Sequence, residues 1–158
     1  MSENLYAPPR ANLERGVEAA PALWNPNAAA LWSLALSPAF GAFLHMKNWE
    51  AIGDAQKASA SRMWVMVTLG AYFLIAMSGV FLPDTKTSDQ ITRAIGIALL
   101  LTWYFSGARP QVQYVKEKFG DGYPRKGWGK ALGLGVLAWL GFVVAIFVVA
   151  FVAALIGR

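Results

Sequence analysis

Few residues in this sequence have the types and spacing that catalysis requires. Two serines, Ser33 and Ser37, precede the single histidine, His45, which lies about two helical turns beyond Ser37. A nucleophilic serine needs a base within hydrogen-bonding reach. Pro38 separates Ser37 from His45, and neither serine has a flanking Gly-x-Ser-x-Gly elbow. We therefore predict no catalytic residue and a non-enzymatic protein.

Metal and cofactor sites are also disfavoured by the composition. The chain has no cysteine and only one histidine, so it offers neither thiolate ligands nor a pair of imidazoles. Glu50 and Asp54 could share a cation from neighbouring turns of a helix, but the sequence around them lacks further oxygen ligands. No phosphate-binding loop or dinucleotide fingerprint occurs. We expect no cofactor and no metal, and a solvated helix over 48–62.

The elements that must hold these residues are apolar. Hydrophobic residues make up 56% of the sequence and charged residues 15%, whereas soluble domains carry about 25% charged residues. A helix of about 20 apolar residues crosses the hydrocarbon core of a bilayer. Four apolar stretches dominate the chain, at 28–46, 63–82, 91–105 and 131–156. The sequence predicts an all-α integral membrane protein with three full transmembrane helices, at 63–82, 88–107 and 129–157.

The first apolar stretch, residues 28–46, contains a break. Pro38 lacks an N–H group and clashes with the preceding turn of a helix. We name Ser37, Pro38 and Gly41 as the candidate structural break. Two short helices should result, which either dip into the membrane as a re-entrant segment or lie along its surface. The alternative is a kinked full span, which would give four transmembrane helices.

The connection before the last span carries the densest charge. Pro110 can begin a helix at 110–119, in which Val112, Val115 and Phe119 form an apolar stripe typical of an interfacial helix. Basic residues close to a membrane attract anionic lipids. The candidate lipid-headgroup contacts are Lys116, Lys118, Arg125, Lys126 and Lys130. We expect the lipid bilayer and its anionic lipids as partners, and no nucleic acid.

Two local patterns concern the ends and faces of the spans. The tetrapeptide Thr87–Gln90 has the form of a capping box that would open the span at 88–107. In the last span, small residues recur at spacings that allow helix backbones to come close. The candidate helix-packing residues are Gly129, Gly133, Gly141 and Ala145. They would serve packing within the chain, or association with a membrane protein partner or a second copy.

Charge in the connections predicts the orientation. Lysine and arginine concentrate at 47–62 and 106–130, and cytoplasmic connections carry an excess of these residues. We therefore expect 47–62 and 106–130 in the cytoplasm, and 83–93 on the other side of the membrane. Residues 1–24 have the composition of a mobile tail, and residues 25–158 should form a single membrane domain.

An ordered pattern of tryptophan, asparagine and proline runs through residues 24–53. It comprises Trp24-Asn25-Pro26, Ser37-Pro38-Ala39-Phe40-Gly41 and Asn48-Trp49, a W-N-P…S-P-x-F-G…N-W arrangement. This arrangement resembles a group of small, uncharacterised bacterial inner-membrane proteins. The resemblance implies a multi-pass protein of the bacterial inner membrane, and it carries over no catalytic residue.

These observations favour a binding or accessory subunit that acts through helix packing and a basic cytoplasmic face. One concrete form is an immunity-type protein that blocks a membrane-targeted toxin. The alternative is a small, oligomeric channel or carrier, although the predicted spans hold almost no ionisable residue of the kind that pumps and coupled transporters use. An enzyme acting on lipid is a third class, for which the sequence offers no nucleophile.

Overall fold

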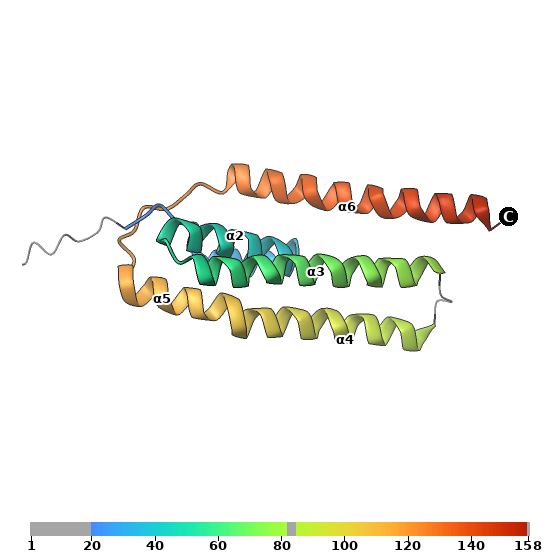
Figure 1. Ribbon diagram of the computed structural model, residues 1–158, viewed down its shortest axis with the longest axis horizontal. Coiled ribbons are helices and arrows are strands. Elements are labelled where there is room, and N and C mark those ends of the chain that lie inside the picture. Colours follow the sequence, from blue (N-terminus) through green and yellow to red (C-terminus); the bar gives the residue numbers. More distant parts are fainter. Residues whose placement is uncertain (1–19, 82–84, 158) are drawn as a thin grey trace, which may run out of the picture.

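The computed structural model describes residues 20–81 and 85–157, and in these residues the protein consists of helices (Figure 1). The first part of the expected tail (1–19), the Leu82 end of the second apolar stretch and Arg158 lie outside the described residues. The helices are α1 (Pro26–Ala35), α2 (Pro38–Ile52), α3 (Ala55–Phe81), α4 (Lys86–Trp103), the π-helical stretch η1 (Tyr104–Ala108), α5 (Arg109–Phe119) and α6 (Gly129–Ile156).

Two short helices, α1 and α2, form a hairpin where the sequence predicts a break. Each begins with a proline at its first position, where the missing N–H group costs nothing. The Asn25 side chain accepts hydrogen bonds from the first backbone amides of α1, and the Ser37 hydroxyl accepts one from Phe40 N at 3.2 Å. Gly53, with a φ of 87°, closes α2 in the left-handed conformation. The predicted break at Ser37 and Pro38 is present.

Three helical stretches are long and apolar enough to cross a membrane. They are α3, the continuous run from Lys86 to Phe119, and α6. The two hairpin helices have 10 and 15 residues, which correspond to lengths of about 15 and 23 Å against a hydrocarbon core of about 30 Å. The all-α class and three helices able to span a membrane are therefore confirmed, and neither helix of the hairpin is by itself long enough to be a fourth.

The start of α4 differs from the expected one. Thr85, with extended backbone, is the N-cap: its hydroxyl accepts from Ser88 N at 3.1 Å, and Ser88 Oγ accepts from Thr85 N at 2.9 Å. These reciprocal bonds make a capping box in which serine takes the place of the usual Glu or Gln. The expected box at Thr87–Gln90 is wrong, because those residues already lie inside the helix.

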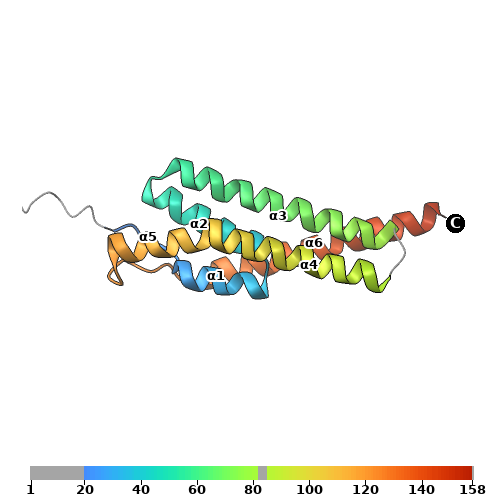
Figure 2. The ribbon, with the colours of Figure 1, turned by 90° about the horizontal axis from the view of Figure 1, so that it is seen from below.

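The helix expected at 110–119 is α5, but it is not a separate helix. It continues α4 through the π-helical stretch η1, and the run from Lys86 to Phe119 is a single helix (Figure 2). Val115 of the expected lipid-facing stripe is only 2% exposed, because it packs against Leu23 and Tyr123 of the same chain. At Val115, the centre of the stripe therefore faces protein and not lipid.

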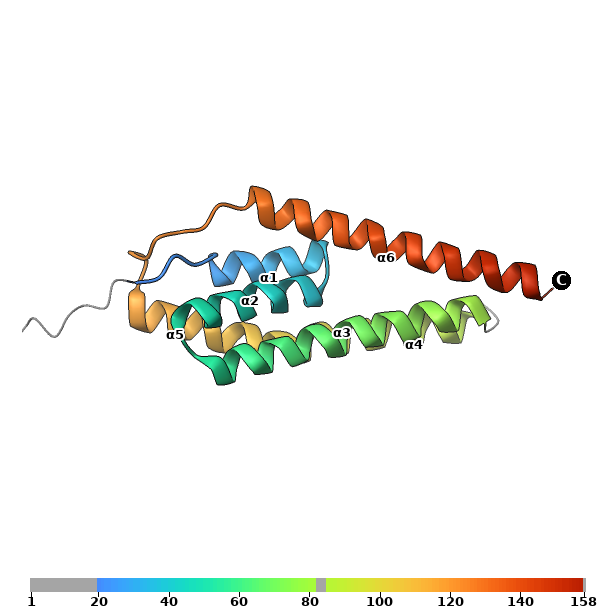
Figure 3. The same cartoon turned by 45° about the horizontal axis from the view of Figure 1, so that its top comes forward.

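The hairpin lies between α6 on one side and α3 with the α4–α5 helix on the other (Figure 3). Its small residues allow this close packing: Ala30 and Ala42 contact Trp103 and Ala108 in one cluster. In another cluster, Ala29 and Leu44 contact Ala131 of α6. Small side chains at helix crossings are typical of packing in membranes. The protein core is therefore centred on the hairpin.

Helix α6 has little protein around it. Ala131 is its one buried residue, and none of its most apolar 18-residue window is buried. The helix contacts the hairpin near Gly135, where an added Cβ would stand 2.7 Å from Phe40 Cε2 and 3.0 Å from Leu36 Cδ1. From there α6 leans toward the far end of α3 (Figure 3).

Candidate functional site: a buried amide cluster under a basic, aromatic end

The segment before α1 is tied to the connection between α5 and α6. Leu23 is fully buried, and its backbone N–H donates to Pro124 O at 2.9 Å while its carbonyl accepts from Lys126 N at 2.8 Å. The Trp24 indole N–H donates to Gly127 O at 3.1 Å. Residues 23–24 and 124–127 are thereby held side by side, although about 100 residues separate them in the sequence.

Asn48 joins this segment to α2. Its Oδ1 accepts from Trp24 N at 3.0 Å, and its Nδ2 donates to Trp24 O at 2.8 Å, so the side-chain amide pairs with both backbone groups of one residue. The same Nδ2 also donates to Gln111 Oε1 at 3.2 Å. Asn48 is fully buried. A buried amide costs stability unless its groups are paired, and here both ends are.

Gln111 completes the connection from α5. Its Nε2 donates to His45 O at 2.8 Å, and the residue is fully buried. The two amide side chains, Asn48 and Gln111, thus link the segment before α1, the helix α2 and the helix α5. We call Trp24, His45, Asn48 and Gln111 the amide cluster.

His45 ties α2 to the start of α1. Its Nε2 lies 3.2 Å from Pro26 O, and a carbonyl only accepts, so Nε2 carries a proton and donates it to this bond. Its Nδ1, like Thr68 Oγ1, is buried without a hydrogen-bond partner among the described residues. The ring also packs edge-on against Trp103, with the centroids 5.7 Å apart. A buried ring that is held by a hydrogen bond and a ring contact suits a structural role.

Basic side chains lie over aromatic rings at this end of the molecule. Lys126 Nζ is 4.4 Å from the centre of the Trp24 ring, and Lys57 Nζ is 4.6 Å from that of Trp49 and 4.7 Å from that of Tyr114. Cation–π contacts of this kind keep a basic group close to an apolar surface while its charge remains near water. This combination suits the boundary between hydrocarbon and headgroups, where tryptophan and tyrosine gather.

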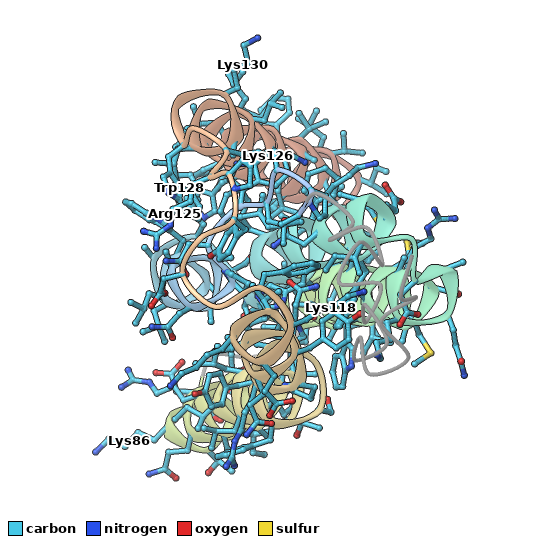
Figure 4. The ribbon with its side chains drawn as sticks, turned by 90° about the vertical axis from the view of Figure 1, so that its left-hand side faces the viewer. Lys86, Lys118, Arg125, Lys126, Trp128 and Lys130 are labelled. Atoms are coloured by element: carbon cyan, nitrogen blue, oxygen red, sulfur yellow. The ribbon has the colours of Figure 1, made fainter. Side chains whose placement is uncertain are left out.

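Figure 4 looks onto this end, which we call the basic end. Of the five predicted headgroup contacts, Lys116 and Lys118 lie on α5, Arg125 and Lys126 on the connection that follows, and Lys130 in the first turn of α6. Arg125 has an acidic neighbour, Asp121, at 3.8 Å. The fold therefore brings the predicted basic residues to one end of the helices, and α2 and α3 add Lys47, Lys57 and Arg62 there.

The two carboxylates that could have shared a cation have other roles. Asp54 accepts from Lys57 N at 2.9 Å and caps α3, and the backbone and side-chain hydrogen bonds from Lys57 lower the pKa of its carboxyl. Glu50 pairs with Lys47 at 2.8 Å, and this hydrogen bond is the main cause that lowers its pKa. In 20–81 and 85–157, no group of three or more acidic or histidine side chains could hold a metal ion.

The predicted glycine positions divide into two kinds. At Gly41 in the predicted break, a Cβ would overlap Ser33 Oγ and would stand 2.6 Å from Trp103 Cη2, so only glycine fits there. At Gly129, Gly133 and Gly141, a Cβ would meet nothing within 4 Å. Ala145 is exposed too. Among residues 20–81 and 85–157, this stripe therefore makes no close helix contact, and its use in association stays a prediction.

An open cavity of about 210 Å³ lies at the tip of the hairpin. Its lining includes the hydroxyl-bearing residues Ser33, Ser37 and Tyr72, and α4 contributes Gly96, Ile97 and Leu100. The remaining lining residues are Leu34, Leu36 and Pro38. This cavity joins two of the residues predicted as a structural break to the middle of two long helices.

Sequence reasoning missed three residues that organise this site: Gln111, Trp103 and Gly135. A signal existed for Gln111, because it lies four residues before Val115, on the face of α5 that was read as apolar. A polar residue on an apolar stripe indicates a buried partner. No family model matches the chain, and no curated protein or solved structure is significantly similar to it.

Proposed function

We propose that the protein is a non-enzymatic binding or accessory subunit of the bacterial inner membrane, with its basic end in the cytoplasm. In this proposal the α1–α2 hairpin enters the membrane from the cytoplasmic side and returns to it as a re-entrant segment. The basic end contacts anionic lipid headgroups, and the uncovered α6 receives a partner helix.

The distribution of charge supports this orientation. Nine of the 14 lysine and arginine residues lie at 47–62 and 106–130, and the fold gathers these two connections at the basic end (Figure 1). Basic residues are favoured on the cytoplasmic side, where anionic lipid adds about 1 kcal/mol for each of them.

The observation that carries the proposal is the rigid attachment of this end to a buried cluster. Lys126 is held over Trp24, and Trp24 is hydrogen-bonded to Asn48 through both of its backbone groups. The positive charges are therefore displayed on a fixed frame rather than on a free tail. A fixed frame loses less conformational entropy when it binds headgroups or a partner.

Lipid binding can be tested with two matched double variants. Replacing Lys126 and Lys130 with glutamine removes two charges from the basic end, and replacing Lys86 and Arg93 removes two from the other end. Mass spectrometry of the purified proteins measures co-purified phosphatidylglycerol. We expect a severalfold loss for the first variant and little change for the second. Equal losses in both variants would contradict a specialised basic end.

The orientation can be tested by accessibility of introduced cysteines, since the chain has none of its own. Cysteines at Asn27, Ala51 and Gly127 should react with membrane-impermeant reagents only from the cytoplasm, and one at Thr85 only from the periplasm. Labelling at Asn27 from the periplasm would show that the first apolar stretch crosses the membrane, and the re-entrant assignment would be abandoned.

The partner can be sought through α6. Val144 is 60% exposed in the middle of this helix, so a photo-crosslinking residue at this position reaches whatever covers it in native membranes. We expect a discrete adduct with one membrane protein or a second copy of the chain. If lipid alone is cross-linked, the accessory-subunit proposal fails. For the immunity-type form, deletion of the gene must raise sensitivity to a toxin encoded beside it.

A small channel or carrier is the second candidate, and the cavity at the hairpin tip favours it. Broken helices inside membranes bind solutes or ions through their freed backbone groups. Solute flux into liposomes containing the purified protein distinguishes the two candidates. Flux that is reduced by substitution of Gly96, which lines the cavity, would favour transport over the accessory role.

A further inference from the structure

The turn of the hairpin leaves backbone carbonyls without partners. Of the last carbonyls of α1, that of Trp32 accepts from Leu36 N at 3.0 Å. Within the described residues, no backbone or side-chain donor reaches the carbonyls of Ser33, Leu34 or Ala35. A continued helix would have served Leu34, but residue 38 is a proline and has no N–H group.

The other side of the turn is satisfied in part by Ser37. Pro38 needs no acceptor, and Phe40 N donates to the hydroxyl and carbonyl of Ser37, while Gly41 N also donates to that carbonyl. Ser37 N and Ala39 N have no acceptor among the described residues, so the free groups at the turn are carbonyls at the end of α1 and two N–H groups. Partners for them must come from another source, because unsatisfied backbone groups are unfavourable in hydrocarbon.

The cavity is lined by two of the residues that carry these carbonyls. Ser33 and Leu34, which carry two of them, line it together with the hydroxyl-bearing Ser37 and Tyr72. Its volume of about 210 Å³ holds several water molecules at about 30 Å³ each. Since α1 has 10 residues, its tip lies about 15 Å from the basic end, near the middle of a bilayer.

We propose that this cavity is a water-binding site inside the membrane. Water molecules in it donate hydrogen bonds to the free carbonyls of α1 and exchange hydrogen bonds with the hydroxyls of Ser37 and Tyr72. Lipid tails could fill the volume but could not donate a hydrogen bond, so they would leave the carbonyls unsatisfied. The inference rests on the proposed insertion of the hairpin.

The test measures water beside the tip directly. A nitroxide label is attached to Leu34→Cys, which lines the cavity, and to Leu74→Cys, an exposed site on α3 close to Tyr72. A label at Ala51→Cys at the basic end provides the reference for bulk water. In bilayers equilibrated with D₂O, electron spin-echo modulation reports nearby deuterium. We expect the modulation at residue 34 to exceed that at residue 74 at least threefold.

A second pair of variants ties the signal to the cavity. Gly96 lines it, whereas Gly79 does not, and a Cβ at either position would meet nothing within 4 Å. Added to the labelled chain, Gly96→Leu should fill the cavity and reduce the modulation at residue 34 to the level at residue 74. Gly79→Leu should leave it unchanged.

The outcomes separate the inference from the proposal beneath it. If residue 34 is as dry as residue 74, or if Gly96→Leu has no effect, the hydrated cavity is refuted while the insertion of the hairpin stands. If residue 34 is as wet as residue 51 and as accessible to a water-soluble nickel chelate, the hairpin lies outside the hydrocarbon and the proposed insertion itself fails.

Discussion

The hairpin buries polar side chains, whereas α6 exposes apolar ones, so the more apolar of the two elements is the less buried. The hairpin holds His45 and Asn48 at 1% exposure or less. Helix α6 has the highest hydropathy of the three long helices, yet Phe147 and Leu137 in it are 71% and 66% exposed. In water this arrangement would be inverted. In a bilayer, apolar side chains face the lipid, and polar groups gather inside the protein, where they find hydrogen-bond partners.

The comparison teaches what specifies a fold when the solvent is apolar. Burying a leucine in protein gains little over leaving it in lipid, since both surroundings are apolar. Close fit and hydrogen bonds remain to distinguish one packing from another. Substitutions in the hairpin should therefore matter far more than equivalent substitutions in α6, and two pairs of variants test this. Two further pairs compare a hydrogen-bonded polar side chain with an exposed one.

The largest difference is expected between two glycines. Gly41→Val places side-chain atoms against Ser33 and Trp103, which should cost about 3 kcal/mol and leave little folded protein. Gly141→Val, on α6, meets nothing within 4 Å and should leave the protein folded. Thermal unfolding in detergent, followed by size-exclusion chromatography, measures both. Similar losses would mean that α6 is as tightly packed as the hairpin.

The amide cluster should give the next largest effect. Gln111→Leu removes the partner of Asn48 and the donor to His45 O, at a cost of about 2 to 3 kcal/mol for buried polar groups left unpaired. Gln113→Leu, at an exposed position of the same helix, should change stability by at most about 0.5 kcal/mol. Equal effects would show that the cluster contributes nothing specific.

Two leucines provide a direct test of the reversed burial. Leu44 is fully buried in the hairpin, whereas Leu140 on α6 is 47% exposed. Leu44→Ala should leave a void and cost about 2 kcal/mol. Leu140→Ala should cost well under that, because lipid fills the space. Reversible unfolding in mixed micelles compares the two, and a larger effect at position 140 would overturn the comparison.

The smallest effect concerns the exit from the hairpin at Asp54. Its carboxyl has a lowered pKa in the folded protein, so its contribution to stability is present above the ordinary value of about 4 and is lost as the pH falls through the lowered one. The melting temperature of Asp54→Asn should lie slightly below that of the unchanged protein at pH 7, and the gap should narrow as the pH falls below about 4. Asp121→Asn, at a fully exposed carboxylate, should leave the melting temperature at pH 7 unchanged.

Local properties of the chain were predictable. Uncharged apolar length identifies α3 and α6 because a bilayer imposes that length, and Ser37-Pro38 identifies the turn because proline cannot continue a helix. The capping box of α4 was predicted too far along the chain, because Thr and Ser occur on both sides of the first residue of the helix, at Thr85 and Ser88.

Features that depend on a partner were not predictable. An amphipathic stripe such as that of α5 does not reveal whether lipid or the same chain will cover it, and here Leu23 and Tyr123 cover Val115. Glycine spacing likewise indicates where a backbone could be approached, but the hairpin meets α6 at Gly135 and not at the predicted positions. A hydrogen bond between side chains far apart in the sequence, such as that between Asn48 and Gln111, produces no periodic pattern in the sequence.

The π-helical stretch at Tyr104–Ala108 has a consequence for how this sequence can change. Five residues of ordinary α-helix rotate a side chain by about 140° beyond a full turn, which would turn Ala108 and Gln111 away from the face that holds Trp103. The widened turn absorbs this excess and restores their phase. Phe105 and Ser106, both exposed, are therefore free to be exchanged for other residues. The loss of either one would return the stretch to ordinary α-helix, in which four residues turn by about 400° and keep α5 close to its present phase. An added residue without such a widened turn would rotate α5 away from Trp103, so natural variation in the length of this stretch should take the form of a loss.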